Sequence, residues 1–299
     1  MVKKQHENLA MRVSVVTILG NLILTVFKLA AGMLAHSGAM ISDAVHSASD
    51  VLSTFVVIAG VKLSGKESDK EHPYGHERLE CVAAVILSVM LAITGAGIGW
   101  AGLQNIFGDA AELVIPGRLA LAAAVISIVS KEAMYWYTRA AAKKLNSPSL
   151  MADAWHHRSD ALSSVGSFVG ICGARLGIPE LDPAASVVIC LFILKAAWDI
   201  FRDAAAKMLD TACPEEMEEE MRQTALAQPG VLGVDRLQTR LFGNRIYVEV
   251  EIAADGEVPL AEAHETSAQV HHAMERRFPM VKHCMVHVNP RIVASKRLP

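Results

Sequence analysis

The sequence predicts an α-helical membrane protein, with a six-helix transmembrane bundle followed by a cytoplasmic α+β domain. Hydrophobic residues make up 52% of the chain but aromatic residues only 5%, a balance typical of helices that approach one another through small side chains in lipid. Near residue 211 the hydrophobic pattern changes from long apolar segments to alternation with a period of two. We therefore expect a transmembrane domain at 1–210 and a cytoplasmic domain at 211–299.

Six apolar segments of the first domain are long enough to cross a hydrocarbon core of about 30 Å. They lie at about 12–35, 37–63, 79–107, 117–142, 148–176 and 183–209. If the segments alternate in direction, most flanking basic residues fall on one side of the membrane, among them Lys3, Lys4, Lys62, Lys66, Lys143 and Lys144. Because basic loops stay on the cytoplasmic side, we expect a multi-pass protein of the inner cell membrane with both termini in the cytoplasm.

Two of the six segments carry the same polar pattern. Asp, His and Asp recur at i, i+3 and i+7, as Asp43, His46 and Asp50 in one segment and as Asp153, His156 and Asp160 in the other. This spacing places each set on one face of a helix over two turns. Each charge inside a membrane costs roughly 2.5–3.5 kcal/mol, so the pattern predicts compensation by a divalent cation shared between the two helices.

The side chains best placed to be metal ligands are His46, Asp50, His156 and Asp160. Within each helix the two ligands, at i and i+4, lie about 6 Å apart on one face. Two imidazoles and two carboxylates form a four-coordinate set that Zn²⁺ prefers. Asp43 and Asp153 lie one turn earlier on the same faces. Four roles remain open for them: proton relay, orientation of the histidines, capping of backbone groups and direct binding of the metal. The alternative is that these histidines and aspartates bind no metal and form polar pairs that stabilise contacts between the helices.

Other polar residues in or near the apolar segments are expected to have structural roles. Pairing between side chains is expected for Lys28, Lys131, Glu132, Lys195 and Asp199. His157 follows a candidate ligand but points about 100° away from it, so we expect it to make a contact on the helix surface. The five cysteines have no paired or CxxC spacing, which predicts neither a disulfide framework nor a thiolate metal site.

The cytoplasmic domain is predicted from a change of period and from its turn residues. Pro214 begins an acidic amphipathic helix, and two strands at 231–241 and 245–253 are joined by a short turn that contains glycine. A helix at 260–278 and a last strand at 282–288 complete an αββαβ order. This order is typical of a small ferredoxin-like or split βαβ domain of about 80 residues.

Together these features resemble the cation diffusion facilitator family of proton-coupled exporters of divalent transition metals. The resemblance rests on the two HxxxD motifs, on the loop His72-Pro73-Tyr74-Gly75-His76 after the second segment, and on the C-terminal αββαβ domain. It implies a homodimeric transporter, not an enzyme, that exchanges Zn²⁺ for protons. Fe²⁺, Cd²⁺, Co²⁺, Ni²⁺ and Mn²⁺ remain alternative substrates, because selectivity among these ions depends on site geometry.

Two other classes of function remain open. A membrane metal sensor or scaffold would use the C-terminal domain chiefly to bind partners. An intramembrane metallohydrolase would need an open metal position and a general base such as the Glu of HExxH, and the sequence has no such motif. The expected partners are a second copy of the chain, divalent cations, protons and membrane lipid, and no nucleic acid.

The loop between the second and third segments contains a second candidate metal site, formed by Asp69, His72 and His76. A DxxHxxxH set with a rigid proline between the histidines offers three ligands and leaves a fourth position open. The alternative is a solvated, charged loop. The resemblance also implies supporting roles for Arg78 and Asp210, because similar proteins have a basic and an acidic residue that interlock at the junction of membrane and cytoplasm.

The C-terminal domain departs in part from the resemblance. Similar proteins hold metal there through histidines on the strands and helix, together with an Asp shortly after the histidine of the last strand. A candidate regulatory site in this chain consists of Glu251, His264 and His287. The positions that depart from the family pattern are Asp235, Glu251 and Asn289. Surface or fold roles are expected for His271, His272 and His283.

Overall fold

The structure is a computed structural model that describes residues 2–34, 38–107, 118–175 and 181–292. Some side chains within these ranges, among them those of residues 41–49, lie outside the description. The chain divides into two compact units, Met1–Ala205 and Ala206–Pro299. Each unit is described by itself below.

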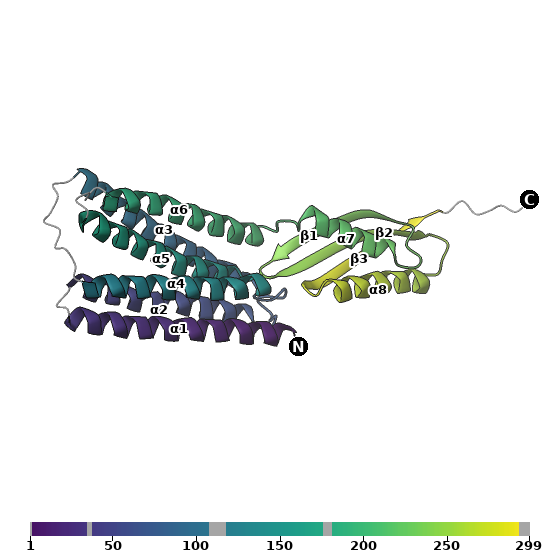
Figure 1. Ribbon diagram of the computed structural model, residues 1–299. Coiled ribbons are helices and arrows are strands. Elements are labelled where there is room, and N and C mark those ends of the chain that lie inside the picture. Colours follow the sequence, from purple (N-terminus) through teal and green to yellow (C-terminus); the bar gives the residue numbers. More distant parts are fainter. Residues whose placement is uncertain (1, 35–37, 108–117, 176–180, 293–299) are drawn as a thin grey trace, which may run out of the picture. The chain divides into compact units, whose positions relative to one another are not determined.

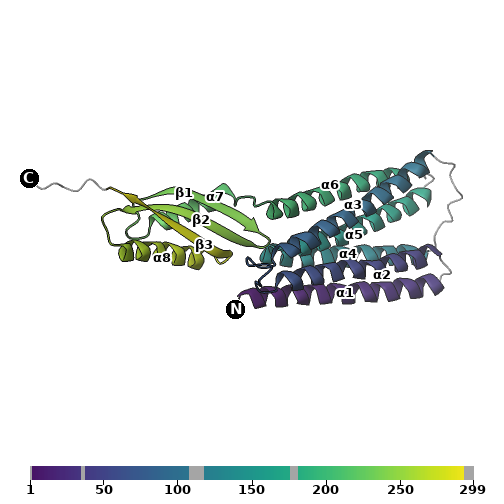
Figure 2. The same cartoon turned by 180° about the vertical axis from the view of Figure 1, so that it is seen from behind.

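Long helices make up the first unit (Figure 1). Over the described residues these are α1 Val2–Leu34, α2 Gly38–Ser64, α3 Arg78–Phe107, α4 Arg118–Leu145, α5 Pro148–Arg175 and α6 Leu181–Met208. Figures 1 and 2 show α1, α2 and α4 side by side from opposite directions, and α1 packs against both of the others. Helix α5 packs against α2, α3 and α4, so much of its surface is covered by other helices.

The apolar content of these helices fits a membrane environment. Among the residues that the structure describes, two stretches are long and apolar enough to cross a bilayer, Asn8–Ala30 in α1 and Arg78–Gln104 in α3. Helix α2 contributes the shorter apolar stretch Ser53–Ser64. Large apolar side chains such as Ile23 and Ile93 are exposed, at 69% and 68%, which is typical of a surface that contacts lipid rather than water.

Helix α2, which contains Asp43, His46 and Asp50, packs closely against α3. At Gly60 an added Cβ atom would lie 2.5 Å from the Cβ atom of Ala83 on α3. No side chain larger than hydrogen fits there unless the helices move apart. Small residues at helix contacts of this kind allow backbones to approach closely in membranes.

The second unit contains a three-stranded sheet with two helices. In chain order its elements are α7 Glu215–Leu226, β1 Gly233–Phe242, β2 Arg245–Asp255, α8 Leu260–Arg277 and β3 Val281–Arg291. The strand order is β1-β2-β3, with β1 and β2 antiparallel and β2 and β3 parallel. The αββαβ order is as predicted, and the two strands joined by α8 are direct neighbours in the sheet.

The core of this unit lies between one face of the sheet and the two helices. It contains Val248, Val250 and Ile252 of β2 together with Met221 of α7 and Met274 of α8, which the alternating pattern of β2 predicts. Strand β3 continues beyond its predicted end at residue 288 to Arg291 and includes Pro290. Proline is tolerated there because β3 is an edge strand, on which a missing N–H group is not needed by a further neighbour.

Candidate metal centre

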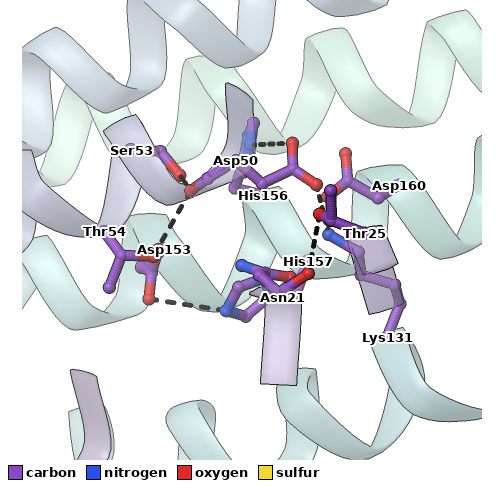
Figure 3. A network of polar contacts seen from close by, with 10 residues as sticks. All are labelled: Asn21, Thr25, Asp50, Ser53, Thr54, Lys131, Asp153, His156, His157 and Asp160. Carbon is purple, nitrogen blue, oxygen red and sulfur yellow. Dashed lines mark hydrogen bonds and ion pairs between the residues drawn. The ribbon is translucent and has the colours of Figure 1, made fainter. Parts of the chain in front are cut away.

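Three of the predicted ligands meet inside the helical unit (Figure 3). Asp50 of α2 and His156 and Asp160 of α5 each offer a ligand atom, and these atoms all lie within 4.8 Å of one another. The three side chains are buried, and the Nε2 atom of His156 lies 3.5 Å from Oδ1 of Asp50. The i, i+4 spacing of His156 and Asp160 on α5 places both toward α2. The arrangement brings together one nitrogen and two oxygen donors, a set that suits a divalent transition metal.

Lys131 of α4 lies between the two carboxylates of this centre. Its Nζ atom is 2.5 Å from Oδ2 of Asp50 and 2.8 Å from Oδ2 of Asp160, and its side chain is buried. The sequence predicts pairing for Lys131 but does not place it in the candidate site. The sequence signal for a place in the site is the positive charge of Lys131 in an apolar segment, since charges inside membrane helices usually mark functional sites.

Asp43 and His46 are the other predicted site residues of α2. Both lie in α2, and His46 precedes Asp50 by four residues. Their side chains fall outside the described residues. A fourth ligand from His46 therefore stays a prediction, as does the supporting role of Asp43.

Asp153 and His157 form a second buried polar pair on α5 (Figure 3). Both side chains are fully buried, and Nε2 of His157 lies 3.5 Å from Oδ2 of Asp153. In the part of the chain that the structure describes, neither Asp153 oxygen and neither ring nitrogen of His157 has a hydrogen-bond partner. His157 thus contacts Asp153 on its own helix, and it is buried because α5 is covered by helices on more than one side.

Other charged residues of the helices have the pairing roles that the sequence predicts. Lys195 and Asp199 form an exposed pair at 2.8 Å. Glu132 accepts a hydrogen bond from the indole N–H of Trp136 at 3.0 Å and lies 3.7 Å from the guanidinium of Arg158. These groups lie at the periphery of the helices, whereas Lys131 is buried in the centre.

The loop between α2 and α3 brings Asp69, His72 and His76 together. Their ligand atoms lie within 4.8 Å of one another, and the two imidazole rings are 4.5 Å apart. A positive φ of 95° at Gly75 turns the backbone between the two histidines, a conformation that glycine adopts without strain. The loop geometry therefore allows the three-ligand site predicted from the spacing.

Hydrogen bonds keep Asp69 in the ionised form that a metal ligand requires. Lys66 donates to Oδ2 at 3.0 Å, and the backbone N–H of His72 donates to Oδ1 at 2.8 Å. The Lys66 hydrogen bond, followed by that from His72, holds the pKa of the Asp69 carboxyl well below its usual value of 3.8. The contacts of Asp69 thus stabilise the loop at pH values above 3.8 and are lost only as pH falls through the lower folded-state pKa.

Asp69→Asn is expected to remove one equivalent of bound zinc per chain, because it removes the charged ligand of the loop but keeps an oxygen acceptor for His72. Equilibrium dialysis of the purified protein measures this. Glu71→Gln, in the same exposed loop, is the control, and an unchanged zinc content in Asp69→Asn would contradict the loop site.

The candidate residues of the cytoplasmic unit lie on different elements. Glu251 and His287 face each other across β2 and β3, and Glu251 lies 3.5 Å from the guanidinium of Arg236. His264 is exposed on α8. Over the described residues, no cluster of ligand atoms within 4.8 Å contains Glu251, His264 and His287 together.

Two of the three positions that depart from the family pattern, Asp235 and Asn289, contact each other. Asn289 donates a hydrogen bond to Oδ2 of Asp235 at 3.0 Å, and Arg291 donates to Oδ1 at 2.8 Å. Arg78 is the first residue of α3, and Asp210 follows α6 with a φ of 57°. The interlock of Arg78 with Asp210 stays a prediction.

The cytoplasmic unit contains the buried cysteines Cys213 and Cys284. Burial raises the pKa of the Cys284 thiol to about 12 and also raises the pKa of Cys213. In the absence of metal both side chains are therefore neutral thiols at neutral pH. The absence of a thiolate metal site stays a prediction.

Comparison with known proteins gives two family matches that cover most of the chain. Residues 14–209 match the cation efflux transmembrane domain, and residues 213–291 match the cytoplasmic domain of cation efflux proteins. The chain is 36% identical over 280 residues to Metal tolerance protein C1 of Arabidopsis thaliana, covering 89% of this chain and 59% of that protein. It therefore spans less than two thirds of that relative's length.

Other relatives match along nearly their whole length. An uncharacterized transporter of Methanocaldococcus jannaschii is 35% identical over 276 residues, which are 92% of this chain and 96% of that protein. The manganese efflux system protein MneP of Bacillus subtilis is 27% identical over 293 residues, 96% of this chain and 98% of that protein. A solved structure of the MamM C-terminal domain is 27% identical and covers 26% of this chain and 98% of that chain, with a TM-score of 0.25.

A helical membrane unit with a buried carboxylate and imidazole centre, joined to an αββαβ domain, defines a membrane cation transporter rather than an enzyme. The chain belongs to the cation efflux family, the cation diffusion facilitators. The resemblance predicted from its motifs is confirmed by both family matches.

Proposed function

We propose that this protein exports a divalent transition metal, with zinc as the favoured substrate, from the cytoplasm in exchange for protons. The observation that carries the proposal is the buried cluster of Asp50, His156 and Asp160. His46 completes it as a fourth ligand and gives two nitrogen and two oxygen donors, a set suited to Zn²⁺. Fe²⁺, Cd²⁺, Co²⁺, Ni²⁺ and Mn²⁺ are the alternative substrates.

Metal entry requires Lys131 to leave the two carboxylates. Its ammonium group is within hydrogen-bond distance of both Asp50 and Asp160, where it neutralises charge that is costly to leave unpaired inside the protein. A divalent cation has the greater charge and binds the same oxygens together with imidazole nitrogen. Lys131 therefore compensates the centre when no metal is bound and competes with the metal for Asp50 and Asp160.

Proton exchange follows from the chemistry of the same ligands. Neutral imidazole and ionised carboxylate bind metal, and protons compete for the same lone pairs when the centre opens to a more acidic exterior. A membrane potential of 100 mV contributes about 2.3 kcal/mol per net charge moved. Asp43 and Asp153 support the ligands or carry protons, and tilting of α2 and α5 provides access from each side in turn.

The proposal extends to the organisation of the protein. Residues 1–210 form a multi-pass transport domain in the inner cell membrane with both termini in the cytoplasm, since the basic flanking residues favour that side. Residues 211–299 form the regulatory domain through which two copies dimerise, with Arg78 and Asp210 as an interlock. The match of residues 213–291 to the cytoplasmic domain of cation efflux proteins supports this role.

Metal-dependent proton flux distinguishes the exporter from a membrane metal sensor or scaffold. Purified protein in vesicles that contain a pH-sensitive dye should release protons from the lumen when zinc is supplied on the cytoplasmic side of the protein. Protein-free vesicles give the background. Zinc binding without either zinc uptake or proton flux would favour the sensor or scaffold.

His46→Asp is expected to lower the ratio of zinc to manganese transport several-fold. The change converts two nitrogen and two oxygen ligands into one nitrogen and three oxygens, and oxygen ligands suit the harder Mn²⁺. Transport of each metal into vesicles, measured separately and in competition, gives the ratio. An unchanged or higher ratio would mean that His46 does not bind the transported metal.

A further inference from the structure

A cluster of two histidines and a glutamate lies on α8, apart from the residues predicted to bind metal. His271, His272 and Glu275 each offer a ligand atom, and these atoms lie within 4.8 Å of one another. The spacing i, i+1 and i+4 brings the imidazole of His271 beside the carboxylate of Glu275, one helical turn away. The rings of His271 and His272 are 5.2 Å apart.

A backbone hydrogen bond fixes which nitrogen of His271 can bind a metal. Its Nδ1 atom lies 2.7 Å from the carbonyl oxygen of Cys284 on β3. A carbonyl oxygen only accepts hydrogen bonds, so Nδ1 carries the proton and donates it. In the neutral ring the other nitrogen, Nε2, therefore has the lone pair. Metal-binding histidines commonly donate their second nitrogen to a backbone carbonyl in this way.

The lone pair of His271 faces a carboxylate. Nε2 of His271 lies 3.3 Å from Oε1 of Glu275. Two ligands about 2.1 Å from a tetrahedral zinc ion lie about 3.4 Å apart. One zinc ion can therefore bind both atoms without a large movement of either side chain.

We propose that His271, His272 and Glu275 form a divalent transition-metal site on the cytoplasmic domain. Two nitrogen donors and one oxygen donor favour zinc, nickel or cobalt over magnesium or manganese. The fourth position belongs to water or to His283 of β3, whose ring is 6.0 Å from that of His271. Because His271 also bonds to the edge strand β3, a bound metal fixes the contact between α8 and β3. The site shares no residue with the transported-metal centre.

Zinc stoichiometry in the full-length chain tests the site. The double variant His272→Gln/Glu275→Gln is expected to bind one zinc fewer per chain than the unsubstituted protein, as measured by equilibrium dialysis in detergent at neutral pH. It leaves His271 and its bond to Cys284 in place. The control Glu262→Gln/Glu265→Gln replaces two other exposed carboxylates on the same helix and should keep the full zinc content. Loss of zinc in the control alone, or in neither variant, would overturn the proposal.

Chemical modification gives a second measurement that needs no substitution. Diethyl pyrocarbonate modifies imidazole nitrogens that carry no metal, and mass spectrometry reports each histidine separately. Saturating zinc should slow the modification of His272 at least 10-fold, whereas saturating magnesium should leave it unchanged, because the site has two nitrogen donors. Equal effects of the two metals at His272, or no effect of zinc, would overturn the site whether or not the protein proves to transport zinc.

Discussion

Asp160→Asn is expected to lower zinc transport at least 100-fold while the protein stays folded. Loss of an outer residue that merely orients a ligand typically costs 10–100-fold in metal affinity, and Asp160 is proposed to bind the metal itself. Asparagine keeps the size of the side chain, and Lys131 keeps its contact with Asp50 at 2.5 Å. Zinc uptake into vesicles containing equal amounts of folded protein is the measurement.

The control for this result is Glu132→Gln on α4. Glu132 is next to Lys131 in the sequence but lies at the periphery, where it contacts Trp136 and Arg158. Its loss should leave transport within about twofold of the unsubstituted rate, because exposed ion pairs contribute only about 0–1 kcal/mol. Asp50→Asn should match Asp160→Asn. Transport by Asp160→Asn at the unsubstituted rate would remove Asp160 from the metal site.

Helical spacing was sufficient to predict much of the buried centre. His156 and Asp160 are four residues apart and lie on one face of α5, and the repeat of the pattern in α2 indicated Asp50 as their partner. Lys131 could not be placed there from spacing, because it is 81 residues from Asp50 and 29 residues from Asp160 along the chain. The packing of α5 against both α4 and α2 brings the ammonium group to the two carboxylates.

A similar limit applies to the cytoplasmic unit. Alternating apolar residues predicted β2 and its neighbours, because the period of two follows directly from strand geometry. The contact of His271 with the carbonyl of Cys284 depends on β3 lying at the sheet edge beside α8. Sequence spacing does not define that topology, so the sequence alone predicts only surface or fold roles for His271 and His272.

Lys131→Met is expected to increase the affinity for zinc at least 10-fold and to slow turnover. In the unsubstituted protein the metal must displace an ammonium group that is hydrogen-bonded to both Asp50 and Asp160. Hydrogen bonds to charged groups contribute about 1.5–3 kcal/mol each, and 1.4 kcal/mol corresponds to a tenfold change in affinity. Methionine has a similar length but no charge, so the competitor is removed. Calorimetric titration with zinc measures the affinity, and vesicle transport measures turnover.

The same substitution should destabilise the metal-free protein, because two buried carboxylates then lack their cation. The melting temperature is therefore expected to fall without zinc, and zinc should raise it by more than in the unsubstituted chain. Lys195→Met is the matched control. Lys195 lies 2.8 Å from Asp199, the same distance that separates Lys131 from Asp160, but Lys195 is exposed. It should change neither zinc affinity nor the melting temperature appreciably. Weaker zinc binding in Lys131→Met would show that Lys131 supports the metal-bound centre instead of competing with the metal for Asp50 and Asp160.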